Sequence, residues 1–313
     1  MRIVFIGTGE IGLPTLRALQ KSDHELVGVV TQPDKPVGRD QKIEPTQVKK
    51  EMAGSNISVL QPARIKDPQA IEQIRAMRPE IIVVMAYGQI LPRDVLEIPT
   101  SACLNLHASL LPCWRGAAPI QAAIAAGDPK TGITVIYMDE GLDTGDILLK
   151  RELEILPTDT GQAVHDRLAK IAAEACLDSL QLLAKGTASR IPQDKELATY
   201  APKLTREDGQ IEWNESAQSI ERKIRAYDPW PGAFTPINGR NLKIFRASIV
   251  EIHGKPGEIL RADRELAIAA NDGALSLIEV QLEGKRRMNA AEFLRGRNLS
   301  SLSRHGGEGS PDS

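Results

Sequence analysis

The chain has 313 residues, of which 42% are hydrophobic, 26% charged and only 4% aromatic, and its formal net charge is −2. This length fits a large domain plus a smaller one, and the apolar content excludes a disordered chain. No stretch approaches the ~18 consecutive apolar residues that cross a bilayer, and the three cysteines lack CxxC spacing, so we expect a cytoplasmic globular protein without disulfides.

The first half of the chain alternates short apolar runs with amphipathic stretches. The runs predict strands at 3–6, 25–31, 57–60, 81–85, 102–105 and 133–137, and the amphipathic stretches predict helices near 13–19, 46–52, 68–77, 117–126 and 161–183. Runs that are apolar on both faces suit a parallel sheet covered by helices on both sides. We therefore predict an α/β, Rossmann-like, open and mostly parallel sheet over residues 1–186.

The pattern changes after Gly186. Residues 187–210 are polar and broken by prolines, and we expect a linker there. A helical pattern at 216–226 follows, and then short runs typical of strands at 242–245, 247–252, 258–260, 266–269 and 275–280, separated by turn signals such as Asn238-Gly239. Such strands predict a smaller C-terminal, OB-like β-barrel domain at 211–300, and we expect a disordered tail at 301–313.

A glycine-rich turn follows the first predicted strand. The run GTGEIG at residues 7–12 matches GxGxxG between a strand and a helix, where this pattern binds a dinucleotide pyrophosphate. The acidic residue that should end the second strand is missing, because Asp34 lies beyond a proline. A tight turn that binds no cofactor explains the same glycines, so the turn itself leaves both interpretations open.

The most informative stretch begins at Asn105. Asn105 and His107 lie two residues apart at the carboxyl end of a predicted strand, so extended geometry places both side chains on one face. Ligand sites in open α/β sheets lie at this edge, and an amide beside an imidazole suits the stabilisation of an oxyanion. Each residue alone is more often a loop cap. In a second loop, residues 139–146, two glycines flank the segment that holds Asp143, without the ligand spacing of a calcium loop.

Other chemistries have less support. The five histidines show no metal-binding spacing, so we expect no metal site. Residues 200–313 hold 17 Lys and Arg against 16 Asp and Glu, so the acidic excess lies in the first two thirds of the chain. Basic residues cluster at Lys35–Lys50, on the helix with Arg222 and Lys223, and along the hairpin with Arg240 and Lys243. These clusters are either solvated faces or contacts for RNA.

Taken together, these motifs resemble the 10-formyltetrahydrofolate-dependent formyltransferases. The residues that carry the resemblance are Asn105-x-His107, Ser109–Pro112, Gly116–Gln121 and Asp139-x-Gly141-x-Asp143-Thr144-Gly145. The runs Thr31–Arg39, Trp114–Pro119 and Tyr227–Pro231 resemble more specifically the branch that acts on methionyl-tRNA. The resemblance covers residues 1 to about 297.

The resemblance implies that the formyl group of 10-formyltetrahydrofolate is transferred to the α-amine of initiator methionyl-tRNA, in support of translation initiation. In such a site Asn105 would donate a hydrogen bond to the formyl oxygen, protonated His107 would stabilise the oxyanion, and Asp143 would keep His107 charged and relay the proton. Folate contacts are expected at Tyr87, Gly88, Ile90, Ser109, Leu110, Leu111 and Pro112. Contacts with tRNA are expected at Arg39, Lys42, Arg222, Lys223, Arg240 and Lys243.

The sequence departs from the family's usual pattern at four places. The usual first turn reads Gly-Thr-Pro-x-Phe-Ala, so Gly9 and Ile11 replace a proline and an aromatic residue, and the GxGxxG match is a by-product of substitutions to glycine. We therefore expect no NAD. Asp40 and Cys113 remove positive character near the expected tRNA path. A sugar-nucleotide amine formyltransferase is the alternative, but it gives no reason for the basic loop. We expect a monomer, because the family's single active site permits one.

Overall fold

The computed structural model describes residues 1–37 and 41–295, and the chain divides into two compact units. Unit 1 comprises residues 1–119, 129–154 and 163–202. Unit 2 comprises residues 120–128 and 155–162 together with the chain from Lys203 onward. Two short stretches that interrupt unit 1 along the chain are therefore grouped with the C-terminal unit, which no sequence pattern indicated.

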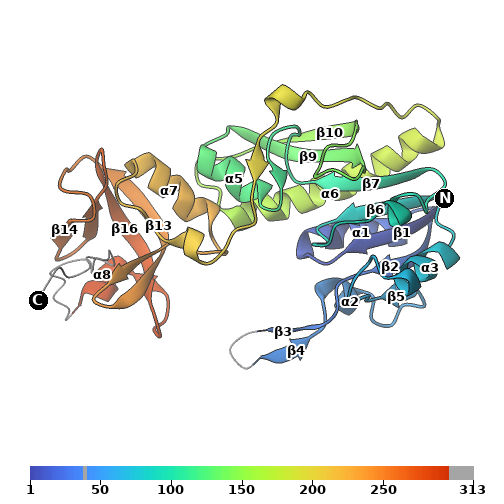
Figure 1. Cartoon of the computed structure of the whole chain (residues 1–313). Helices are drawn as coiled ribbons and strands as arrows, with labels where there is room; N and C mark the ends of the chain where they lie inside the picture. Colours follow the sequence, from blue (N-terminus) through green and yellow to red (C-terminus); the bar gives the residue numbers. More distant parts are fainter. Residues whose placement is uncertain (38–40, 296–313) are drawn as a thin grey trace, which may run out of the picture. The chain divides into compact units, whose positions relative to one another are not determined.

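Unit 1 is built on a seven-stranded sheet of order β10-β9-β7-β6-β1-β2-β5 (Figure 1). Its strands are β1 Arg2–Gly7, β2 Glu25–Val30, β5 Val59–Leu60, β6 Ile81–Met85, β7 Ala102–His107, β9 Lys130–Tyr137 and β10 Ile147–Glu154. The strands β5, β2, β1, β6 and β7, which are neighbours in this order, pair in parallel. Strand β9 pairs antiparallel with both β7 and β10. The expected open, mostly parallel sheet is confirmed.

Helices cover both faces of this sheet. They are α1 Leu13–Lys21, α2 Gln47–Glu51, α3 Pro68–Ala76, α4 Arg93–Leu96 and α6 Gly161–Ala184. A further helix, α5 Pro119–Ala126, lies almost entirely in a stretch grouped with unit 2. Ile71 and Ile74 of α3 and Val95 of α4 belong to one buried cluster with alternate strand residues such as Ile82. On the opposite face, Thr15 of α1 donates a hydrogen bond to the Met85 sulfur at 3.8 Å. Because successive residues of a central strand pack against helices on opposite faces of the sheet, these strands are apolar throughout.

Close packing accounts for the glycines of the first turn. A Cβ at Gly7 would lie 2.7 Å from the Met85 carbonyl oxygen and 2.7 Å from the Phe5 ring, and one at Gly12 would lie 3.0 Å from that ring. The Gly9 amide donates to the Ala86 carbonyl at 3.3 Å. The turn from β1 into α1 therefore needs small residues where it crosses the end of β6, whatever it binds.

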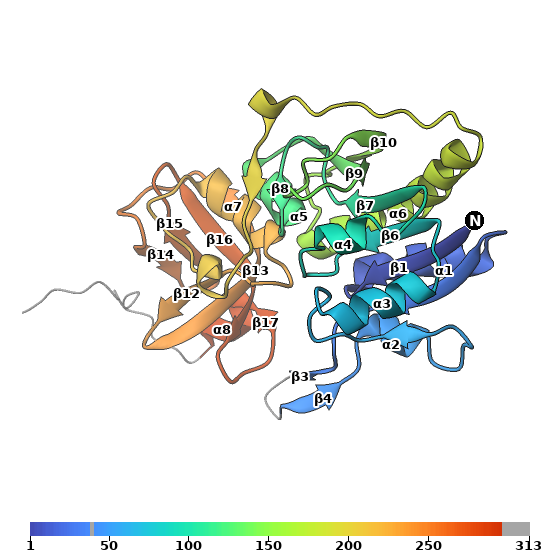
Figure 2. The same ribbon diagram turned by 45° about the vertical axis from the view of Figure 1, so that its right-hand side comes forward.

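Unit 2 contains an antiparallel sheet of order β12-β13-β16-β15-β14, with β17 paired to β16 (Figure 2). Its elements are α7 Ala217–Ala226, β12 Phe234–Ile237, β13 Arg240–Val250, β14 Ile259–Ala262, β15 Leu266–Ala269, β16 Ala274–Leu282, β17 Met288–Asn289 and α8 Ala290–Leu294. Ile220 and Ile224 of α7 share one core with these strands. Asn238 and Gly239 have φ of 47° and 75°, as the hairpin turn requires.

Some elements differ from the sequence prediction. The edge strand β10 was missed because its second half, Lys150–Glu154, is charged and largely exposed. The hairpin of β3 Lys35–Val37 and β4 Lys42–Glu44 projects from the sheet in Figure 1 and carries no strong strand signal. The segment 187–210 is not a structureless linker, since β11 Tyr200–Ala201 pairs in parallel with β8 Arg115–Gly116. The expected tail 301–313 lies outside the described residues.

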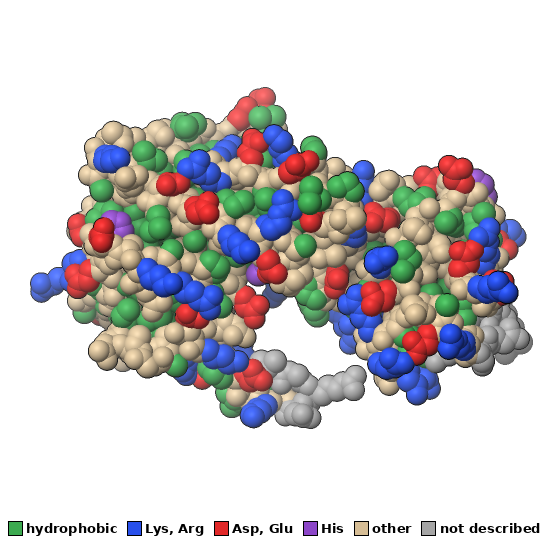
Figure 3. Space-filling model, turned by 180° about the vertical axis from the view of Figure 1, so that it is seen from behind, with side chains coloured by type: hydrophobic (Ala, Val, Ile, Leu, Met, Phe, Trp, Pro, Cys, Tyr) green, Lys and Arg blue, Asp and Glu red, His purple; other side chains and the backbone are tan. Residues whose placement is uncertain are grey.

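Charged side chains of both signs are spread over one face of the molecule. On the face drawn in Figure 3, Lys and Arg side chains are interleaved with Asp and Glu over both units. Among the described residues, no helix is both long and apolar enough to cross a membrane.

Candidate active site

The end of β7 brings Asn105 and His107 to one place in unit 1. Asn105 pairs with Val84 of β6 on one side and with Ile136 of β9 on the other, and His107 pairs with Thr134. The two side chains lie on the same face of the strand, as their spacing predicts, and both contact Asp143. The His107 side chain is only 6% exposed, so its surroundings are mainly other protein groups.

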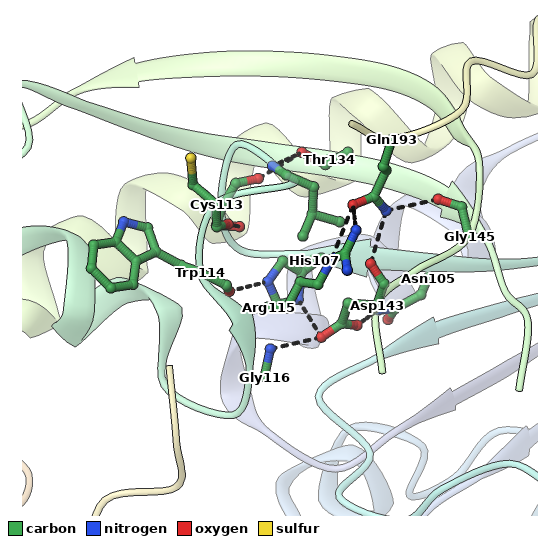
Figure 4. A network of polar contacts seen from close by, with 12 residues as sticks. Asn105, His107, Cys113, Trp114, Arg115, Gly116, Thr134, Asp143, Gly145 and Gln193 are labelled. Atoms are coloured by element: carbon green, nitrogen blue, oxygen red, sulfur yellow. Dashed lines mark hydrogen bonds and ion pairs between the residues drawn. The ribbon is translucent and has the colours of Figure 1, made fainter. Parts of the chain in front are cut away.

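Asp143 connects the catalytic candidates (Figure 4). One carboxylate oxygen, Oδ1, accepts a hydrogen bond from Asn105 Nδ2 at 3.2 Å. The other, Oδ2, accepts one from the Gly116 amide at 2.9 Å and lies 3.5 Å from His107 Nδ1. The loop that holds Asp143 follows β9, whose last residue pairs with Leu104, and this register places the loop beside Asn105.

The two ring nitrogens of His107 both face oxygen atoms. His107 Nε2 lies 2.8 Å from the Trp114 carbonyl oxygen, which can only accept, so Nε2 is the donor in this contact. Nδ1 faces the Asp143 carboxylate. Both ring nitrogens of His107 therefore face oxygen atoms that can only accept a proton or a hydrogen bond.

The Ser109–Pro112 segment is held tightly beside these residues. Ser109 Oγ donates to the Cys113 carbonyl at 2.6 Å, and Thr134 Oγ donates to the Ser109 carbonyl at the same distance. Ser109 and Leu111 are fully buried, whereas Leu110 and Pro112 are partly exposed. Of the four predicted folate contacts in this segment, the structure leaves Leu110 and Pro112 with side-chain surface for a ligand.

The predicted folate residues after β6 lie at the same edge of the sheet, because β6 and β7 run in parallel. Tyr87 is 3% exposed and packs into the core under α3 and α4, where burial raises its pKa to about 12. Its carbonyl accepts from Gln32 Nε2 at 3.0 Å. Gly88 is exposed, with φ of 83°, and Ile90 is 83% exposed. Ile90 thus offers side-chain surface to a ligand and Gly88 its backbone, whereas the ring of Tyr87 serves the core.

The basic residues predicted for tRNA are in different situations. Arg39 lies outside the described residues, and Lys42 is exposed on β4. Arg222 donates to the Ala126 carbonyl at 3.3 Å, and Lys223 forms an ion pair with Glu215.

The two basic residues predicted along the hairpin, Arg240 and Lys243, also differ in where they point. They lie three positions apart on β13, so their side chains point to opposite faces. The sequence places both residues along one hairpin, and the strand geometry adds that they face opposite sides of it.

Sequence reasoning missed Gln193, Thr199 and Arg115. Thr199 Oγ accepts from the Trp114 amide at 2.8 Å, and Arg115 donates to Gln193 Oε1 through Nη2 at 2.7 Å. Gln193 and Thr199 thus hold the Trp114–Gly116 turn from a segment about 80 positions away, for which no periodic pattern exists. Among the described residues, no group of three or more His, Cys, Asp or Glu is arranged to hold a metal ion.

Two families match the chain, one described as formyl transferase over residues 1–180 and one as formyl transferase, C-terminal domain, over residues 203–298. A methionyl-tRNA formyltransferase from Geobacter sulfurreducens is 44% identical over 311 residues, which are 99% of this chain and 98% of the relative.

Solved structures show the same fold. The sugar 3N-formyl transferase WlaRD, crystallised in the presence of dTDP and 5-N-formyl-THF, has a TM-score of 0.68 at 18% identity over 91% of this chain and 99% of its own. A methionyl-tRNA formyltransferase from Clostridium thermocellum has a TM-score of 0.57 at 21% identity over 90% and 98%. The expected α/β domain with a smaller C-terminal barrel-like domain is thereby confirmed.

Proposed function

The chain belongs to the methionyl-tRNA formyltransferase family, and we propose from this premise that Asn105, His107 and Asp143 transfer the formyl group of 10-formyltetrahydrofolate to the α-amine of initiator methionyl-tRNA. The protein is a formyltransferase that acts on methionyl-tRNA and uses a folate derivative. The sugar-nucleotide alternative is set aside, because the near full-length relatives at about 45% identity act on tRNA.

Asn105 and His107 stabilise the charge that develops on the formyl oxygen. When the amine attacks the formyl carbon, a C–N bond forms and the oxygen gains negative charge. The Asn105 amide carries two hydrogens, of which one is used by Asp143, so the second is available for this oxygen. The imidazolium of His107 adds a fixed positive charge in a buried place, where it acts more strongly than in water.

Asp143 moves the proton. The attacking amine must lose one proton, and N10 of the folate must gain one as its bond to the formyl carbon breaks. A carboxylate that contacts both Asn105 and His107 is placed to accept the first proton and to return it to N10. No covalent enzyme intermediate is needed, since the amine itself is the nucleophile.

We place the folate and tRNA binding surfaces where the predicted contact residues are exposed. We assign the folate to the edge of unit 1 formed by Leu110, Pro112, Gly88 and Ile90, because apolar side-chain surface there suits a pterin ring. The exposed residues Lys42 and Arg240 and the loop that holds Arg39 are assigned to the tRNA. We also propose that the enzyme acts as a monomer, because one chain supplies the whole catalytic group. We place it in the cytoplasm, because its three cysteines are free.

The contact of Asp143 with both Asn105 and His107 is the observation that carries this proposal. It is tested by a formylation assay with charged initiator and elongator tRNAs, with and without 10-formyltetrahydrofolate. We expect Asp143→Asn and His107→Ala to lower turnover by at least ~100-fold, from general acid–base and oxyanion stabilisation. Near-normal turnover in either variant would refute the role given to that residue.

A further inference from the structure

The segment 190–201 contacts two parts of the candidate site, the loop that holds Asp143 and the Trp114–Gly116 turn. Its Ile191 exchanges two backbone hydrogen bonds with Ile147, at 2.8 and 3.0 Å, just after the Asp143 loop. The Arg190 guanidinium lies 3.6 Å from the centre of the Tyr137 ring, just before that loop. Further on, the Thr199 carbonyl accepts from the Arg115 amide at 2.8 Å. The segment therefore fastens the Asp143 loop to the Trp114–Gly116 turn.

Gln193 lies at the centre of this segment (Figure 4). Its Nε2 donates to the carbonyl oxygens of Asp143 and Gly145, both at 2.8 Å. Its Oε1 accepts from Arg115 through Nε at 3.2 Å and Nη2 at 2.7 Å. Carbonyl oxygens can only accept and a guanidinium can only donate, so the amide has one orientation here and all its hydrogen-bonding capacity is used.

Asp143 needs such support because its backbone is in the left-handed region, with φ of 54°. A non-glycine residue holds this conformation only where its surroundings over-determine it. In this conformation the carboxylate reaches Asn105 and the Gly116 amide, while the carbonyl turns toward Gln193. The buried Arg115, which is 4% exposed, fixes the other end of Gln193.

We propose that Gln193, anchored by Arg115, is a positioning residue that holds the Asp143 backbone so that its carboxylate meets Asn105 and His107. This inference rests on the proposed role of Asp143. Gln193 does not touch the reacting atoms. It acts through the loop, and its loss changes the rate of proton transfer more than the binding of either substrate.

The variants Gln193→Glu and Gln193→Ala test this inference. Gln193→Glu keeps the size of the side chain and its contact with Arg115 but replaces the donated hydrogen bonds by repulsion between oxygen atoms. We expect kcat to fall by ~10- to 100-fold, with KM for both substrates changed less than ~3-fold and the melting temperature close to that of the parent. If Gln193 only tied down the segment through Arg115, Gln193→Glu would retain full kcat. The exposed neighbour Asp194, changed to Ala, loses only a local cap on Glu196 and serves as the matched control.

A double-mutant cycle with Asp143→Asn separates the two proposals. If Gln193 acts through Asp143, either Gln193 variant adds less than ~3-fold to the loss already caused by Asp143→Asn. Multiplicative losses overturn the positioning role. A slow Asp143→Asn with a fully active Gln193→Glu overturns this inference alone, whereas a fully active Asp143→Asn overturns the proposed function and with it the inference. Gln193→Ala gives the same cycle should Gln193→Glu not fold.

Discussion

The substitution Gly145→Ala tests whether the reaction rate depends on the position of the loop that holds Asp143. A Cβ at this residue would lie 1.7 Å from the carbonyl oxygen of Tyr137, and side-chain carbons do not approach closer than 3.0 Å, so the loop must retreat by at least about 1.3 Å. The φ of Gly145 is not in the left-handed region, so alanine suffers no backbone strain there. The obstacle is a backbone carbonyl of the sheet, which cannot rotate away.

A retreat of this size displaces the loop that holds Asp143. Since misplacement of a catalytic group by about 1 Å can cost ~100-fold in rate, we expect kcat/KM of Gly145→Ala to fall by about 100-fold, or about 2.7 kcal/mol of transition-state stabilisation. The measurement is formylation of initiator methionyl-tRNA under kcat/KM conditions, with circular dichroism to confirm that the variant is folded.

Gly141→Ala is the matched control in the same loop. Its Cβ would meet the Thr144 hydroxyl at 2.0 Å. That hydroxyl is on a partly exposed side chain, which can rotate at the cost of its hydrogen bond to Asp139, so we expect less than ~10-fold loss. A Gly145→Ala enzyme within ~3-fold of the parent, or equal losses in the two variants, would refute the reasoning that loop position limits the rate.

Two further predictions concern electrostatics. Raising salt from about 50 to 200 mM should weaken tRNA binding at least ~10-fold while folate affinity stays within ~2-fold, and Arg240→Ala should lower the tRNA salt slope by about one; equal slopes for both ligands in a binding titration would contradict the assignment. Arg17 donates two hydrogen bonds to Glu51, and these bonds, reinforced by the arginine charge, hold the pKa of that carboxyl below its ordinary 4.5. The carboxylate therefore stabilises the fold above that ordinary value, and the benefit is lost as pH falls through the lowered pKa. Glu51→Gln should destabilise by at most about 1 kcal/mol in urea unfolding at pH 7, because the pair is partly exposed, and by progressively less as pH falls through the lowered pKa.

The catalytic candidates could be predicted because their spacing carries geometric information. Two residues at i and i+2 on a strand share a face in any sheet, so Asn105 and His107 were expected side by side, and both contact Asp143 in the structure. The glycines around Asp143 indicated a tight turn. That Asp143 takes a left-handed backbone and accepts from the Gly116 amide depends on residues distant in sequence.

The folate and tRNA residues show what a pattern cannot decide. Tyr87 and Ser109 are in motifs that resemble ligand contacts, yet the fold buries their side chains, because exposure depends on what packs over them. Lys223 is in a basic cluster, but its charge is paired with Glu215. The number of basic residues in a stretch of sequence therefore does not give the charge that the folded surface presents to a partner.

The sequence by itself indicated the fold class, since hydrophobic periodicity is a property of neighbours along the chain. The family resemblance, carried by local motifs, indicated the reaction and the three residues that we propose at its centre. Only the tertiary structure brings residues 190–201 against the Asp143 loop and the Trp114–Gly116 turn. In the sequence this segment looks like a linker, because it is polar and broken by prolines. Its hydrogen bonds are made with other loops, so its sequence needs neither helical nor strand periodicity. Gln193 reaches Asp143 and Arg115 across 50 and 78 positions, and such pairings form only when the sheet has brought its loops together.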